Sequence, residues 1–210
     1  MKLTKFEHAC IAVEQDDQSL IVDPGGYTTD LVIPDNVVAV VITHEHADHL
    51  DKTHLQTIKD KNPDVTIVAH ESITSQLGEF KTQAVMANEG IKIGNFELEF
   101  YGGEHAVINP DWPTIPNLGV LINERLYYPG DSFVVPDRAV EVLALPVAAP
   151  WLKISETMAF LQQVKPRLAF PTHDAILSDA GKGLPDGMLP GIAEQVGTKY
   201  QRLTEPLEIA

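Results

Sequence analysis

The stretch Thr43-His44-Glu45-His46-Ala47-Asp48-His49 places three histidines and one aspartate within seven residues. Imidazole nitrogens and carboxylate oxygens are the protein donors that suit Zn²⁺, Fe and Mn²⁺. Side chains two residues apart in an extended segment point the same way, so His44 and His46 can bind one ion together. Asp48 and His49 follow where we expect the chain to turn into a helix, and they can face a second ion nearby. The stretch therefore predicts a metal site with two neighbouring positions.

The residues on either side of this stretch predict a strand and a helix. Val37–Thr43 is a continuous apolar run, which is typical of a strand buried on both faces. Asp51–Lys61 has Leu55 and Ile58 on one face and Pro63 just beyond its end, which predicts a helix. We therefore expect the donors to lie on a loop where a buried strand ends.

The rest of the chain alternates between strand-like and helix-like segments. Apolar or alternating runs predict strands at 9–13, 19–22, 65–69, 91–100 (a hairpin), 118–122, 126–128, 140–147, 167–170 and 202–209. Helices are expected at 72–77, at 156–164 with Ser155 as N-cap, and within 189–200, whereas Gly181–Gly187 predicts a Gly/Pro-rich loop. This order predicts sheets packed together and covered by helices on their outer faces.

Length, charge and cysteine usage limit the class of protein. A chain of 210 residues is most simply one domain, which we place at residues 1–210. Its formal net charge of −15 should repel phosphate backbones, so we expect no nucleic-acid partner. No run approaches the ~18 apolar residues of a membrane span, so we expect no membrane partner. The N-terminus has no apolar signal core and Cys10 is the single cysteine, which together favour a cytoplasmic protein.

Three further donors lie where other strands should end. They are the last residue of Gly102-Gly103-Glu104-His105, the aspartate of Tyr128-Pro129-Gly130-Asp131-Ser132, and the last residue of Phe170-Pro171-Thr172-His173. Taken alone, a histidine at a strand end is usually a hydrogen-bonded surface or core residue. Beside the His/Asp stretch, His105, Asp131 and His173 become candidate metal ligands.

With these donors in order, the chain resembles the metallo-β-lactamase-fold hydrolases, whose His-x-His-x-Asp-His motif is intact here. The resemblance spans nearly the whole chain. Within that superfamily the chain is most similar to the compact group that includes ascorbate-6-phosphate lactonase-like hydrolases, through His8-Ala9, Leu145-Pro146-Val147 and the final Pro206-Leu207-Glu208-Ile209. The resemblance implies an α/β fold, a four-layer αββα sandwich of two mixed β-sheets covered by helices.

The resemblance also implies a role for each donor. Two triads would each bind one divalent metal, and one carboxylate would bridge them: His44, His46 and His105; Asp48, His49 and His173; and Asp131 as the bridge. The metals would be Zn, with Mn or Fe as alternatives. A hydroxide shared by two such ions can attack a carbonyl or phosphoryl centre, with Asp48 as the catalytic residue that orients it and moves its proton. The implied function is hydrolysis of a small ester, lactone or phosphoester.

Two other functions stay open at this point. Some members of the superfamily are mononuclear iron dioxygenases that act on persulfides, and others bind metal without catalysis. Two metals per chain would favour the hydrolase, one iron per chain would favour the dioxygenase, and the complete donor set argues against a non-catalytic protein. His46 replaces the glutamate of flavodiiron proteins, which favours hydrolysis over oxygen reduction. In each case we expect a small-molecule substrate, and a homo-oligomer is possible.

The segment Ala106–Asn117 is expected to be a lid or wall of the substrate pocket. It directly follows His105, and its prolines exclude a helix and stiffen an irregular path: Pro110, Pro113 and Pro116. Trp112 could present an apolar surface to a substrate. The alternatives are that Trp112 packs into a satellite core or that the loop mediates a subunit contact.

Two other histidines have open roles. His8 either hydrogen-bonds a strand end or supports a metal ligand from behind. His70 should end a strand and is expected to be structural, although it could also line the rim of the pocket.

Overall fold

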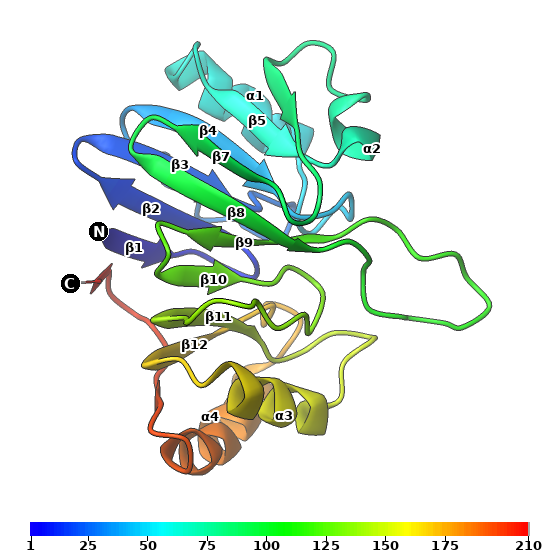
Figure 1. Ribbon diagram of the computed structural model, residues 1–210, viewed down its shortest axis with the longest axis vertical. Helices are drawn as coiled ribbons and strands as arrows, with labels where there is room; N and C mark the ends of the chain where they lie inside the picture. Colours follow the sequence, from blue (N-terminus) through cyan, green and yellow to red (C-terminus); the bar gives the residue numbers. More distant parts are fainter. Residues whose placement is uncertain (210) are drawn as a thin grey trace.

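The computed structural model describes residues 1–209, so Ala210, the last residue of the expected domain 1–210, lies outside the described part. Within the described residues, two seven-stranded sheets pack face to face (Figure 1). Helices α1 and α2 cover the outer face of one sheet, and α3 and α4 cover the other. The expected four-layer αββα sandwich is therefore confirmed.

The first sheet carries the His/Asp stretch after its interior strand β4. Its order is β14-β1-β2-β3-β4-β5-β6, antiparallel from β14 to β3 and parallel from β3 to β6. Its strands are β1 (Lys2–Lys5), β2 (Ile11–Gln15), β3 (Gln18–Val22), β4 (Val37–Ile42), β5 (Thr66–Ala69), β6 (Thr82–Ala84) and β14 (Leu207–Glu208). The carboxyl ends of β1, β3 and β4 therefore lie at one edge.

The second sheet has the order β13-β12-β11-β10-β9-β8-β7. It is antiparallel from β7 to β10 and parallel from β10 to β13. Its strands are β7 (Gly90–Ile93), β8 (Phe96–Gly102), β9 (Leu118–Ile122), β10 (Leu126–Tyr128), β11 (Val142–Pro146), β12 (Leu168–Thr172) and β13 (Lys199–Tyr200). Strands β8, β10, β11 and β12 point the same way, so the loops that follow them share one edge.

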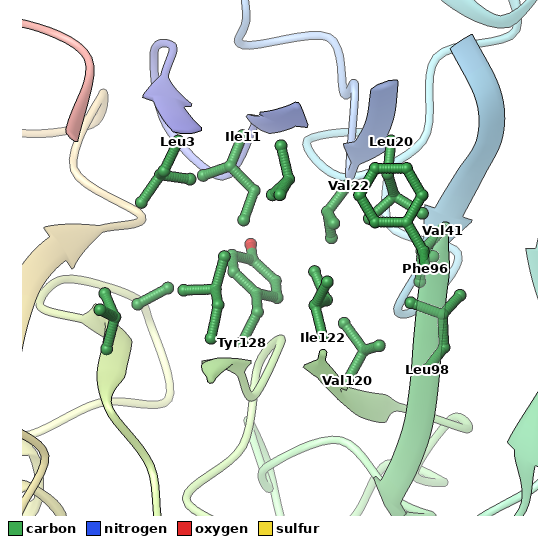
Figure 2. Packing of buried hydrophobic residues seen from close by; sticks show 14 of the residues in the cluster. Leu3, Ile11, Leu20, Val22, Val41, Phe96, Leu98, Val120, Ile122 and Tyr128 are labelled. Carbon is green, nitrogen blue, oxygen red and sulfur yellow. The ribbon is translucent and has the colours of Figure 1, made fainter. Parts of the chain in front are cut away.

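An apolar layer fills the space between the two sheets (Figure 2). Leu3 and Leu20 of the first sheet and Phe96, Val120 and Tyr128 of the second are at most 2% exposed. Full burial of a large apolar side chain stabilises the folded state by roughly 1.5–3 kcal/mol. This layer holds the two sheets at a constant separation, and so holds the loops at their shared edge.

The four helices add two outer apolar layers in the described part of the chain. They are α1 (Lys52–Lys61), α2 (Glu71–Thr74), α3 (Ile154–Val164) and α4 (Asp179–Glu194). Leu55 and Ile58 of α1 are buried on the first sheet, as expected, and Phe160 and Leu189 are buried on the second. None of these helices has both the length and the apolar character that crossing a bilayer requires.

The Gly/Pro-rich segment 181–187 is a helix, so the predicted loop is wrong. Helix α4 runs through it without a break and includes Pro185. The side chain of Ser178 caps the start by accepting the Gly181 backbone N–H at 3.2 Å. Pro185 and Leu189 are buried on the side that faces α3 and the second sheet. Tertiary burial here outweighs the weak helix propensity of glycine and proline.

Other boundaries also differ from the expectation. The N-cap of α3 is Lys153 and not Ser155, because the Glu156 carboxylate accepts the Lys153 backbone N–H at 2.9 Å and starts the helix earlier. Strands β1 and β6 were not predicted, since both are short and partly exposed. The expected strand 202–209 is reduced to β14, because Arg202 is bound to Asp186 instead of following a regular strand.

The helix through the unexpected segment gives a direct test. Gly187 is exposed on α4, and within residues 1–209 no heavy atom other than nearby helix backbone would lie within 4 Å of a methyl group there. Gly187→Ala should raise the free energy of unfolding by about 1 kcal/mol, because alanine loses less backbone entropy in a helix. Urea unfolding measures the change. A loss of stability would mean that residue 187 lies in a loop.

Candidate metal site

The structure brings all seven predicted donors to one edge of the paired sheets. Four come from the loop after β4, and the others follow β8, β10 and β12: His105, Asp131 and His173. They form two adjacent groups in which the donor atoms lie within 4.8 Å of one another: His44, His46, His105 and Asp131; and His8, Asp48, His49 and His173. His8 is the one member that the expected ligand set did not include.

The Asp131 carboxylate is the centre of the cluster. Its Oδ2 lies 3.3 Å from Nε2 of His105 and 3.1 Å from Nε2 of His173. Its Oδ1 lies 3.2 Å from Nε2 of His49. Two ligand atoms on a tetrahedral zinc, at bond lengths of 2.0–2.1 Å, are about 3.3 Å apart. The distances from the Asp131 oxygens to the three imidazole nitrogens are therefore those expected between neighbouring ligands of one metal ion.

The pair His44 and His46 has the same spacing. Nε2 of His44 lies 3.1 Å from Nδ1 of His46, with the two rings edge to face. His44 is fully buried, whereas His46 is only half-buried. Each of the two groups thus has one partly exposed member through which solvent or a substrate can reach it, His46 in the first and Asp48 in the second.

Four buried polar atoms in the cluster have no hydrogen-bond partner among the described residues: Nε2 of His49, His105 and His173, and Oδ1 of Asp131. Leaving a buried donor or acceptor unsatisfied costs about 1–3 kcal/mol each. All four face the space between the two groups. A pair of divalent cations would satisfy them at once, so the residues present fit a metal centre.

The opposite ring nitrogens fix which tautomer each histidine adopts. Nδ1 of His49 donates to Oδ2 of Asp23 at 2.7 Å, and Nδ1 of His105 donates to the Ala106 carbonyl at 2.6 Å. Nδ1 of His173 likewise donates to a backbone carbonyl, that of Ala148. With their protons on Nδ1, these rings direct the Nε2 lone pair into the cluster.

Asp23 is a functional residue that the sequence reasoning missed. It is fully buried at the end of β3, and its carboxylate accepts the Thr43 backbone N–H at 2.8 Å and hydroxyl at 2.6 Å, besides the His49 imidazole. It thus fixes both the start of the His/Asp stretch and one of its rings. Its position in Asp-Pro-Gly-Gly indicated only a chain break, although a strand end at the same edge was a usable signal.

His8 supports a candidate ligand from behind. Its Nδ1 accepts the Ala175 backbone N–H at 3.3 Å, so its proton lies on Nε2, which donates to Oδ2 of Asp48 at 3.0 Å. The ring is fully buried and lies against that of His173, with the centroids 4.0 Å apart. Both ring nitrogens are occupied, so we assign His8 to orienting Asp48. His70, in contrast, caps α2 by accepting the Ser72 backbone N–H, which is a structural role.

Trp151 is the other residue that the sequence reasoning missed. Its indole N–H donates to Oδ2 of Asp131 at 2.8 Å, and its ring packs edge-on against His105 and Phe133. The side chain is 9% exposed and follows the end of β11, at the same edge as the donors. An indole that donates to the central carboxylate limits how that carboxylate can rotate.

Two glycines let the backbone approach the donors closely. A Cβ at Gly25 would lie 1.8 Å from the carbonyl oxygen of Asp48, so no side chain fits there. Gly130 has a φ of +62°, and a Cβ there would lie 2.4 Å from Oδ1 of Asn117. That same oxygen accepts the backbone N–H of Asp131 at 2.9 Å. Both glycines are therefore needed for the donor geometry.

Opposite charges inside the cluster shift the pKa values of its carboxylates and imidazoles. Burial alone would raise the pKa of Asp131, but the imidazoles of His49 and His105 outweigh burial and hold that pKa well below its usual range. Burial lowers the pKa of an imidazole, yet the adjacent carboxylates of Asp131 and Asp48, 3.1 and 3.3 Å from Nε2, raise the pKa of His173 to about 9. A divalent ion would supply the same positive charge, so its binding should displace protons.

Comparison with known proteins agrees with this geometry. A family model described as Beta-lactamase superfamily domain matches residues 2–173. The chain is similar to Protein Rv0786c of Mycobacterium tuberculosis, at 37% identity over 98% of this chain and 97% of that one. It is also similar to a UPF0173 metal-dependent hydrolase of Methanocaldococcus jannaschii, at 27% identity over 81% and 83% of the two chains. The structure of Igni18, a metallo hydrolase of Ignicoccus hospitalis, superposes with a TM-score of 0.77 at 18% identity over 100% of this chain and 99% of that one. At this identity the likeness shows the fold alone.

The bond between Trp151 and Asp131 predicts an effect on metal affinity. Trp151→Phe keeps an aromatic ring but removes the N–H, so Asp131 loses a fixed partner. Loss of such a supporting bond should weaken metal binding about 10–100-fold. Competition with a chelator for Zn²⁺ measures the affinity, and Trp112→Phe, at an exposed position, is the control. Equal Zn²⁺ affinity in both variants and the wild type would remove Trp151 from the site.

Proposed function

This chain belongs to the beta-lactamase superfamily and is a metal-dependent hydrolase, and we propose that it uses two divalent metal ions to cleave a small ester, lactone or phosphoester. The observation that carries the proposal is the set of four buried, unpartnered atoms that converge between the two donor groups in the described structure. Such a set is costly unless cations satisfy it.

We assign the donors to two metal positions joined by one carboxylate. His44, His46 and His105 would hold the first ion, and Asp48, His49 and His173 would hold the second. Asp131 would bridge them, because its two oxygens face imidazoles of both groups. The nitrogen-rich donor set favours zinc, with manganese or iron as alternatives.

When bound, two such ions would supply a water of lowered pKa and a Lewis acid for the oxygen of the substrate. Asp48 is the residue placed to orient the attacking water. Burial alone would raise the pKa of Asp48, but the adjacent imidazole of His173 and the hydrogen bond from His8 hold that pKa well below the usual range, so the carboxylate is ionised. His8 keeps that carboxylate in one orientation, and the partly exposed His46 and Asp48 mark where a substrate would enter.

Composition and position support the rest of the proposal. The net charge of −15 disfavours a nucleic-acid substrate, so we propose a small molecule. Cys10 is fully buried, and burial raises the pKa of its thiol, which suits a reduced, unreactive cysteine in the cytoplasm. We treat residues 1–210 as one catalytic domain, because both sheets contribute donors to the same cluster.

Metal analysis followed by a substrate panel tests the function. The purified protein should contain two divalent ions per chain and should cleave at least one class among lactones, phosphodiesters and thioesters. A chelator should remove the activity, and the added metal should restore it. One iron per chain together with persulfide oxidation would instead identify a dioxygenase.

The bridging role of Asp131 predicts the metal content of a variant. Asp131→Ala should bind fewer than two ions per chain, because the carboxylate that offsets repulsion between the ions is gone. Elemental analysis after gel filtration gives the stoichiometry. Asp111→Ala, which removes an exposed carboxylate from the loop after His105, is the control. Two tightly bound ions and full activity in Asp131→Ala would contradict the assignment.

The role of Asp48 predicts that activity and metal content separate. Asp48→Asn should lower kcat at least about 100-fold while keeping more of its metal, because an amide oxygen still coordinates weakly but cannot take a proton. Asp51→Asn is a matched control, since asparagine caps α1 as well as aspartate does. Normal turnover by Asp48→Asn would exclude Asp48 from the chemical step.

A further inference from the structure

A cavity of about 130 Å³ lies under the loop that follows His105. Two candidate ligands, His46 and His105, form part of its wall, and the loop supplies the rest. The main apolar wall residues are Val107, Ile108, Trp112 and Ile115. The cavity therefore adjoins the first of the two candidate metal positions, which supports the expectation that this loop is a wall of the substrate pocket.

The loop is held in shape without any ligand. At its base the His105 backbone N–H donates to the Ile115 carbonyl at 2.9 Å, and the Ala106 N–H donates to the Asp131 carbonyl at 2.8 Å. At its tip the backbone N–H of Trp112 donates to the backbone carbonyl of Asn109 at 3.0 Å. A group that enters this cavity would thus meet a preformed surface, with little ordering cost.

Apolar side chains on this loop are unusually exposed. Trp112 is 62% exposed, Val107 55% and Ile108 40%, although they are neighbours on one wall. The loop extends well beyond the sheets between β8 and β9 (Figure 1). Exposed apolar groups that gather beside a candidate catalytic centre are typical of a surface that covers part of a ligand.

The cavity also lacks the groups that recognise a phosphate. Its lining, within the described residues, contains no lysine or arginine. Sites that bind phosphoryl groups normally supply such cations. On the other side of His46, a cavity of about 520 Å³ contains Lys52, but its ammonium donates to the Gln76 carbonyl and Glu45 lies in the same lining.

The size of the cavity limits what enters it. A cavity of ~150 Å³ accommodates a benzene ring. The 130 Å³ space would therefore take a ring or a branched chain of about four to six carbons. Each methylene that moves from water into such a space should tighten binding about fourfold.

We propose that residues 106–116 form an apolar subsite, and that the preferred substrate is a neutral ester or lactone whose acyl carbon carries a hydrocarbon group of about this size. This inference rests on the proposed hydrolytic function. In the reaction, the oxygen of water forms a bond to the acyl carbon, the bond from that carbon to the alcohol oxygen breaks, and a proton passes to the departing alcohol. An ester gives a carboxylic acid, with its apolar group in the subsite, and an alcohol, whereas a lactone opens to a single hydroxy acid.

A substrate set with one shared leaving group tests the preference. The zinc-loaded wild type should cleave para-nitrophenyl hexanoate with a kcat/KM at least about tenfold above that for para-nitrophenyl acetate, and far above that for para-nitrophenyl phosphate. Trp112→Ala should lose most of this preference, because the KM for the hexanoate ester rises while the kcat/KM for the acetate ester stays nearly unchanged. Leu184→Ala, an exposed residue of α4 outside the lining, is the control. Faster cleavage of para-nitrophenyl phosphate than of the hexanoate, or an unchanged preference in Trp112→Ala, would overturn the subsite. The proposed hydrolytic function would still hold in either case.

Binding of a product-like acid separates the subsite from catalysis. Calorimetry should show isovalerate binding at least about tenfold more tightly than acetate or inorganic phosphate, and Trp112→Ala should abolish that difference. This measurement tests the subsite even if no ester is cleaved. In that case the proposed function is wrong, and the affinity for isovalerate relative to acetate and phosphate alone decides whether the subsite exists. Sedimentation gives the remaining outcome: a dimer that Trp112→Ala dissociates, with no difference among the acids, would show that the loop binds a second copy.

Discussion

The rest of the structure depends on one constraint: a buried carboxylate, that of Asp131, must be held among imidazoles that have no other partner on that side. Such a cluster is unfavourable in a protein interior unless the geometry is close and the charge is compensated. Bonds to Trp151 and to Asn117, and a glycine at position 130, fix the position of Asp131. The burial that makes the cluster costly is the same property that would strengthen its hold on a cation.

The fold meets this constraint by assigning each donor to a different strand end. Parallel strands in both sheets point toward one edge, and the apolar layer between the sheets keeps those ends at a constant distance. Behind the donors lies a second set of polar groups that orients them, in which Asp23 directs His49 and His8 directs Asp48. The result is a centre whose first donor group, at His46, is overhung by an apolar loop.

The seven candidate donors could be proposed from sequence because few residue types bind metals and because all seven lie in loops that follow apolar strands. The same runs predicted packed sheets covered by helices, and the resemblance to the metallo-β-lactamase fold implied that there are two of them. Asp23 and Trp151 could not be assigned, since their roles depend on partners 26 and 20 residues away, which no local pattern indicates. The segment 181–187 was misjudged for a related reason: its glycines and prolines favour a loop, and only burial against α3 and the second sheet makes it a helix.

The donors are divided between the two sheets: those of the His/Asp stretch follow β4, while His105, Asp131 and His173 follow strands of the second sheet. An ion that binds both sets would act as a cross-link between layers that otherwise meet through an apolar core. Because the unfolded chain cannot present this arrangement, resistance to unfolding would then follow mass action, and each tenfold rise in free ion above its Kd would add about 1.4 kcal/mol. The supply of metal around the protein would govern its lifetime as well as its chemistry.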